Sequence, residues 1–228
     1  MPRRGKPAGL SLRDARREMY RQRILTAAEY EFAKAGFDKT PMSAIAATAD
    51  LSLATLYSSF AGKDDIWNAL NAQRMNELVG MVREATDFIE SPLERILVGA
   101  RAQVDFFTGH TNFLRLHVNE GFSWATATQL GRGGQRWAWR TGIEMMTRAA
   151  QLAAEAGELV SVDPAVAAKL AVSALQVWLT QWVEGGAVTA PGVLADELVD
   201  HLRRSLALPG TALRFSKTKA GRGGDRTA

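Results

Sequence analysis

The polar residues between positions 40 and 65 have the types and spacing needed to contact a nucleic acid. The stretch reads as two short helices joined by a turn at Asp50, with apolar residues at helical spacing. Leu56 and Phe60 of the second helix are assigned to a core. The residues left over are Ser52, Ala54, Thr55, Tyr57, Ser58, Ser59 and Lys63. They are small, hydroxyl-bearing or basic, and such side chains suit close approach to phosphates and base edges.

The ends of these two helices are also marked in the sequence. Thr40 can cap the first helix with Pro41 at its first position, and Ser52 can cap the second. We expect Gly62 to provide a left-handed exit from the second helix. The pattern predicts a helix-turn-helix, whose second helix lies in the major groove, but it also fits a plain helical hairpin with a solvated polar face.

Positive charge is concentrated at the two ends of the chain. The formal net charge is +4, but residues 1–25 carry eight Lys or Arg against two acids, and residues 214–228 carry five against one. A basic arm before a helix-turn-helix suits phosphate neutralisation or insertion into the minor groove. The residues that we assign to DNA on this ground are Arg3, Arg4, Lys6, Arg13, Arg16 and Arg17. For the basic run that starts at Lys217, a solvated tail is the better interpretation.

The motif and the helix before it resemble the N-terminal domain of the TetR family of transcriptional regulators. The resemblance runs from about Arg21 to Ile66. The matching residues are Gly36, Phe37, Thr40, Ile45, Ala46, Ala49, Ser52, Thr55, Leu56, Tyr57, Phe60 and Lys63. Asp50 and Ala54 stand where the family commonly has glycine, and Ser59 stands where it commonly has histidine or an aromatic residue. Aspartate tolerates left-handed backbone better than most residues. The operator sequence cannot be transferred from a relative, because Ala54 and Ser59 lie on the recognition helix.

The resemblance implies a homodimer that binds double-stranded DNA at a palindromic operator and is released by a small-molecule effector, as a repressor is. By resemblance, Thr40, Ser43 and Lys63 would hold phosphates. Thr55, Tyr57 and Ser58 would approach base edges or the adjacent backbone. An effector-independent DNA-organising protein is the alternative, since it would share the dimer and the motif but have a filled core.

Helical spacing continues nearly throughout the chain and predicts an all-α fold of about nine helices. Three belong to an N-terminal helix-turn-helix domain and six to a ligand-binding and dimerisation domain. The boundaries that we predict are a basic arm over 1–18, the helix-turn-helix domain over 19–62, the second domain over 63–208 and a basic tail over 209–228. Within the second domain, Ser91 to Glu94 reads as a capping box, and Gly131 to Gly134 reads as a break.

The segment 165–183 is apolar almost all round, so it is buried on every side or spans a membrane. Lys169, Gln176 and Gln181 would be expensive to place in lipid, and we therefore expect no membrane span. Burial by a second copy explains the segment better. The resemblance implies that residues 164–184 and 191–206 pair across a two-fold axis. The N-terminus lacks the apolar core of a secretory signal, so we expect a cytoplasmic protein.

Aromatic residues are concentrated in the second domain, and most of them are expected to be core. Cavities between helices are mostly apolar, so several can also line an effector site. Six tryptophans suit a hydrophobic or aromatic ligand, for example a polyketide-like or acyl molecule. The candidate lining residues are Phe106, Phe107, His117, Trp124, Trp137, Trp178 and Trp182.

No catalytic or metal-binding pattern stands out in the sequence. The chain has no cysteine, which excludes a thiolate nucleophile, a disulfide framework and a cysteine metal site. His117 and Glu120 share one helix face, but a metal would need further ligands. The glycines from 131 to 134 lack the preceding strand and the lysine of a nucleotide-binding loop. We therefore predict no enzyme activity, no metal and no cofactor.

Overall fold

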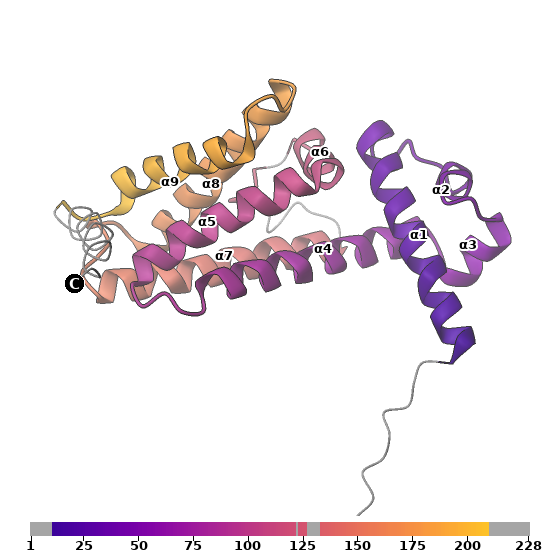
Figure 1. Cartoon of the computed structure of the whole chain (residues 1–228), viewed down its shortest axis with the longest axis horizontal. Helices are drawn as coiled ribbons and strands as arrows, with labels where there is room; N and C mark the ends of the chain where they lie inside the picture. The colour runs from indigo at the N-terminus through magenta and orange to yellow at the C-terminus, as the bar shows by residue number, and fades with distance from the viewer. Residues whose placement is uncertain (1–10, 122, 127–132, 210–228) are drawn as a thin grey trace, which may run out of the picture. The chain divides into compact units, whose positions relative to one another are not determined.

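The structure, a computed structural model, describes residues 11–121, 123–126 and 133–209. In these residues it has nine helices, namely α1 (Leu12–Ala35), α2 (Met42–Thr48), α3 (Leu53–Ser59), α4 (Lys63–Thr86), α5 (Pro92–Gly109), α6 (Thr111–Asn119), α7 (Gly133–Glu155), α8 (Pro164–Glu184) and α9 (Pro191–Leu206) (Figure 1). The predicted all-α fold is confirmed. Several residues named in the sequence analysis lie outside the described residues, namely Arg3, Arg4, Lys6, Gly131 and the tail from Lys217.

A search of the described helices for a segment long and apolar enough to cross a membrane finds none.

The chain divides into two compact units, residues 1–70 and 71–228, and the division falls within α4. The first unit is built on α1, α2 and α3 together with the start of α4. Phe32, Phe37 and Trp67 lie at its centre, with ring centroids 5.0 to 5.6 Å apart. This aromatic cluster packs the end of α1 and the chain after it against the start of α4.

The turn between α2 and α3 follows the sequence prediction. Asp50 has a φ of 51°, so it occupies the left-handed conformation that the family usually assigns to glycine. Arg23 Nη2 donates to Asp50 Oδ2 at 3.2 Å from the neighbouring helix α1. Ser52 caps α3, because its hydroxyl oxygen accepts the Thr55 N–H at 3.1 Å. These contacts fix where α3 begins.

Three expectations about helix ends in this unit are wrong. The residue that precedes α2 is Pro41, and the Thr40 hydroxyl instead donates to the carbonyls of Glu31 and Gly36, at the end of α1. Gly62 does not have a positive φ. Its carbonyl accepts the Ile66 N–H at 3.3 Å, so it leads into α4 and does not end α3. The predicted arm over 1–18 is also too long, because α1 begins at Leu12 after the cap residue Ser11.

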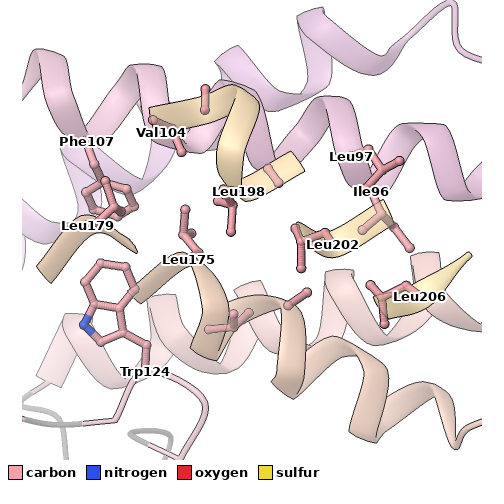
Figure 2. Packing of buried hydrophobic residues seen from close by; sticks show 14 of the residues in the cluster. Ile96, Leu97, Val104, Phe107, Trp124, Leu175, Leu179, Leu198, Leu202 and Leu206 are labelled. Carbon is pink, nitrogen blue, oxygen red and sulfur yellow. The ribbon is translucent and has the colours of Figure 1, made fainter. Parts of the chain in front are cut away.

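In the second unit α5 packs against α7, α8 and α9. Leu198, Leu202 and Leu206 of α9 belong to the same buried cluster as Ile96, Leu97 and Val104 of α5 (Figure 2). The same pair of helices is joined by Glu94 and Arg203, whose side chains form two hydrogen bonds of 3.0 and 3.1 Å. This two-bond geometry is the strongest form of an arginine–carboxylate contact.

The start of α5 is capped by a residue that lies far away in the sequence. Ser91 accepts the Glu94 N–H at 3.1 Å, as a capping box predicts. The side chain of Glu94 does not complete the box, because it binds Arg203. Glu158 takes this place, with Oε2 accepting the Leu93 N–H at 2.8 Å and the Ser91 hydroxyl at 2.9 Å.

Replacing Glu158 by alanine should therefore lower the free energy of unfolding by about 1–2 kcal/mol, since it leaves a partly buried N–H without its acceptor. Urea denaturation at fixed protein concentration measures the change. Glu155→Ala is the matched control, because Glu155 is an exposed glutamate three residues earlier. Its effect should stay within about 0.5 kcal/mol. An equal loss in the two variants would contradict the capping role.

Candidate functional site

The exposed side of α3 carries most of the residues predicted to approach DNA. Ser52, Ala54, Tyr57 and Ser58 are exposed, and Thr55 is half-buried. More than half of the Tyr57 side chain, 53%, is open to solvent. The opposite side of the helix is closed, with Leu56, Ser59 and Phe60 buried.

Two residues of α3 differ from the sequence expectation. Ser59 was counted with the exposed polar residues, but it is buried and its hydroxyl donates to the Thr55 carbonyl at 3.0 Å. Leu53 lies on the exposed side and was not identified. An apolar residue next to a helix cap is normally predicted to be buried, so nothing in the local sequence indicates that Leu53 is exposed.

Lys63 and Thr40 are both engaged inside the first unit. Lys63 Nζ donates to the carbonyls of Phe37, Asp38 and Thr40 at 2.7, 3.1 and 3.0 Å. An ammonium group has three N–H donors, and here each has an acceptor. The Thr40 side chain is only 1% exposed. The side-chain donors of Lys63 and Thr40 are thus bonded to carbonyls within the first unit, whereas Ser43 is exposed on α2.

Basic residues of α1 are spaced to lie along one side of that helix. Arg13, Arg17 and Arg21 are four residues apart, a spacing that aligns side chains on a helix. Arg21 Nη1 donates to the Ser59 carbonyl at the end of α3, at 3.0 Å, and its guanidinium lies 4.3 Å from the centre of the Phe60 ring. Arg13 and Arg17 are exposed on the turns before it. Sequence reasoning missed the role of Arg21, because its partner is 38 residues away.

The second unit contains a cavity of about 240 Å³. Its wall comes from α4, α5, α7 and α8 together with Trp124, and it is mostly apolar. Phe107 and Trp124 belong to the predicted lining set, and they lie at the same end of the core in Figure 2. Trp139 and three methionines, Met75, Met145 and Met146, also line it and were not in that set.

The other predicted lining residues lie elsewhere. Phe106 and His117 are buried but are not part of the cavity wall. Trp178 and Trp182 line a separate depression beside α9, and Trp182 Nε1 donates to the Thr189 carbonyl at 2.8 Å. The Trp137 side chain lies outside the described part of the structure. Helical spacing shows which residues point inward, but not which inward faces leave a gap between them.

Few polar groups reach the cavity. Thr86 and Gln103 line it, but each donates to a carbonyl of its own helix. The indole Nε1 of Trp124 is buried and has no hydrogen-bond partner, which leaves a donor that an acceptor group of a ligand can satisfy. Burial lowers the pKa of the nearby His117 to about 3, so this residue stays neutral at physiological pH.

Across the residues that the structure describes, no group of three or more His, Asp or Glu side chains is placed to hold a metal ion.

Comparisons with known proteins agree with this arrangement. The family model of the bacterial regulatory proteins of the tetR family matches residues 24–70, which include the helix-turn-helix. No curated protein sequence matches the chain.

Solved structures of low sequence identity share the fold of most of the chain. A TetR-like transcriptional regulator from Rhodococcus sp. RHA1 is 22% identical with a TM-score of 0.65, covering 81% of this chain and 94% of that one. The regulator FadR from Bacillus subtilis, in complex with stearoyl-CoA, is 17% identical with a TM-score of 0.66, covering 79% and 96%. A transcriptional regulator from Saccharomonospora viridis in complex with choline is 15% identical with a TM-score of 0.68, covering 84% and 100%. Residues 24–70 therefore match the tetR family of bacterial regulatory proteins, and the chain has the fold of TetR-like transcriptional regulators.

Proposed function

We propose that the protein is a repressor that binds a palindromic operator as a homodimer in the cytoplasm and is released by a small hydrophobic molecule. The main observation that supports this proposal is that helix α4 contributes residues to both units. The helix begins at Lys63, which is bound to three carbonyls of the first unit, and its later residues Met75, Leu78 and Val82 line the cavity of the second. A molecule that moves these later turns therefore acts on a helix whose start belongs to the DNA-binding unit.

In this proposal the exposed side of α3 enters the major groove. Ser52, Ala54, Thr55, Tyr57 and Ser58 approach base edges and the neighbouring backbone, in keeping with their exposure and size. Ser43 on α2 and the exposed Arg13 and Arg17 on α1 contact phosphates.

Thr40 and Lys63 have a different role from the one that the family resemblance implies for them. Since their polar atoms are already bonded within the unit, we assign them to positioning α2 and α4. They support the DNA contacts of other residues and do not bind phosphate with their side chains.

The homodimer is proposed to form through α8 and α9. Val166, Leu170 and Val177 of α8 and Val193 of α9 are exposed apolar residues in the single chain. Contiguous exposed apolar surface marks an interaction site, and a two-fold pairing is the commonest way to cover it. Two recognition helices held in this way must match half-sites about 34 Å apart, so a small change in their separation weakens both contacts.

The effector is proposed to occupy the cavity, because its wall is apolar with few polar groups, as ligand sites between helices are. A similar fold binds stearoyl-CoA in FadR and choline in the Saccharomonospora viridis protein. Release of DNA then depends on the difference in the ligand's affinity for the DNA-binding conformation and for the released one.

Tyr57→Ala should lower operator affinity at least about tenfold while the protein stays folded, because the exposed ring lies on the proposed DNA face and not in the core. A gel shift with a duplex selected by the protein measures the affinity, and circular dichroism measures the helix content. Tyr30→Ala is the matched control, since Tyr30 is similarly exposed, at 48%, but lies on α1. Unchanged operator binding by the Tyr57 variant would place the DNA contact elsewhere.

Deletion of residues 1–10 removes Arg3, Arg4 and Lys6 and should weaken binding to all duplexes alike. The slope of log affinity against log salt should become shallower by up to about three units, since fewer counterions are released. Removing residues 214–228, which also carry five basic side chains, should leave the slope unchanged. A constant slope after the N-terminal deletion would show that the arm does not touch DNA.

A compound that binds the cavity should change tryptophan fluorescence, because Trp124 and Trp139 line it. The compound should weaken operator binding, and the operator should weaken compound binding by the same factor, typically about 5–150-fold. Titration of the compound with and without operator measures this coupling. Equal affinity in the two titrations would remove the effector response and favour the DNA-organising alternative.

A further inference from the structure

The cavity of the second unit has enough volume to hold an alkyl chain. A cavity of about 150 Å³ holds a benzene molecule, so by proportion the 240 Å³ observed here accommodates roughly ten carbon atoms. Aliphatic, aromatic and thioether side chains make most of the wall. Gly99 and Gly142 widen it, since neither carries a side chain. Arg95 is the one charged residue among the described lining residues.

A surface groove adjoins the cavity at Arg95. The groove and the cavity share Arg95, Met145 and Ala149, and the groove adds a second arginine, Arg148, and one acid, Glu144. Apolar space therefore leads to a rim that carries two guanidinium groups.

These two guanidinium groups have no carboxylate partner within the described part of the chain. Arg95 Nε donates to the carbonyl of Ile89, and Arg148 Nη1 lies 3.5 Å from Oε1 of the neutral Gln151. Glu144 makes its ion pair with Arg140, at 3.9 Å, and not with either rim arginine. The positive charge at the rim is thus available to a ligand.

We propose that the effector is an amphiphile with an unbranched apolar chain in the cavity and an anionic head group held at the rim by Arg95 and Arg148. The head is a carboxylate, or a phosphorylated carrier joined to the chain through a thioester. This inference rests on the proposed function, in which the cavity is the effector site, and adds the charge and shape of the ligand. A quaternary ammonium head such as choline does not fit, because the rim carries Arg95 and Arg148 against one acid, Glu144, which is already paired with Arg140.

The proposal can be tested with four probes that have ten-carbon chains and different heads. These are decanoate, decanoyl-CoA, decanol and decyltrimethylammonium, each titrated below its micelle-forming concentration into the full-length protein. Tryptophan fluorescence reports binding, and a gel shift reports release of the operator duplex. We expect decanoate or decanoyl-CoA to bind at least about tenfold more tightly than decanol. The better of these two identifies the head as a free acid or a carrier ester. Decyltrimethylammonium should bind most weakly.

Variants then test the assigned residues. Arg95→Gln combined with Arg148→Gln should lower the affinity for the anionic probe by about 3- to 30-fold and leave that for decanol unchanged, in the range expected for two exposed ion pairs. Arg115→Gln is the control, because Arg115 is an exposed arginine of α6 outside the cavity and groove.

Gly142→Leu should block binding of every probe while DNA binding and helix content are retained. Gly142 lines the cavity and a Cβ there meets no atom within 4 Å, so we expect a leucine side chain to take up part of the cavity. The change also removes a glycine from the interior of α7.

If decanol or decyltrimethylammonium bound as tightly as the anionic probes, or more tightly, the anionic head would be wrong. If such a probe also released the operator duplex, the proposed function would still stand. An equal loss of affinity for decanoate and for decanol in the double arginine variant would overturn the role of the two guanidinium groups. If no probe bound, or if binding left the operator complex unchanged, both the effector site and this inference would fall.

Discussion

The ammonium group of Lys63 satisfies a set of carbonyls that the helices leave open. The carbonyls of Phe37, Asp38 and Thr40 lie in the chain between α1 and α2, outside any helix, and all three accept from Lys63 Nζ. One charged donor group serves all three, and hydrogen bonds of this kind are roughly twice as strong as neutral ones. The end of α1, the approach to α2 and the start of α4 are thereby fixed around a single side chain. The exposed side of α3 can present its residues only because these three elements hold their positions.

In the second unit, the contacts that hold α5 in place are concentrated on the side that faces α9. Between α5 and α9, the Glu94–Arg203 pair and a continuous row of leucines join the two helices, and Glu158 caps the start of α5. The cavity lies where α4 and α7 meet α5, and its wall includes glycines and methionines in place of such ties. The α5–α9 contact and the cavity therefore lie on different sides of α5, so the cavity does not weaken that contact.

Much of the fold could be predicted from the sequence, because helix ends depend on local residues. Ser52 and Ser91 mark helix starts in the sequence and do so in the structure. Most exposed positions of α3 followed from the same spacing, with Leu53 and Ser59 as the exceptions. What could not be predicted depends on partners far apart in the chain. Thr40 has the right type for a cap but bonds back to α1, and the bonds of Arg21 and Glu158 span 38 and 65 residues. The cavity wall was predicted only in part for the same reason.

The methionines in the cavity wall have a consequence for how selective the protein can be. Met75, Met145 and Met146 have unbranched side chains with three rotatable bonds and a polarizable sulfur, and such chains repack around different shapes at little cost. A wall of this kind fits homologous molecules of neighbouring length almost equally well. Under the proposed function, a protein with such a wall would report on a class of compounds, and its response would follow their combined concentration more than that of any one member.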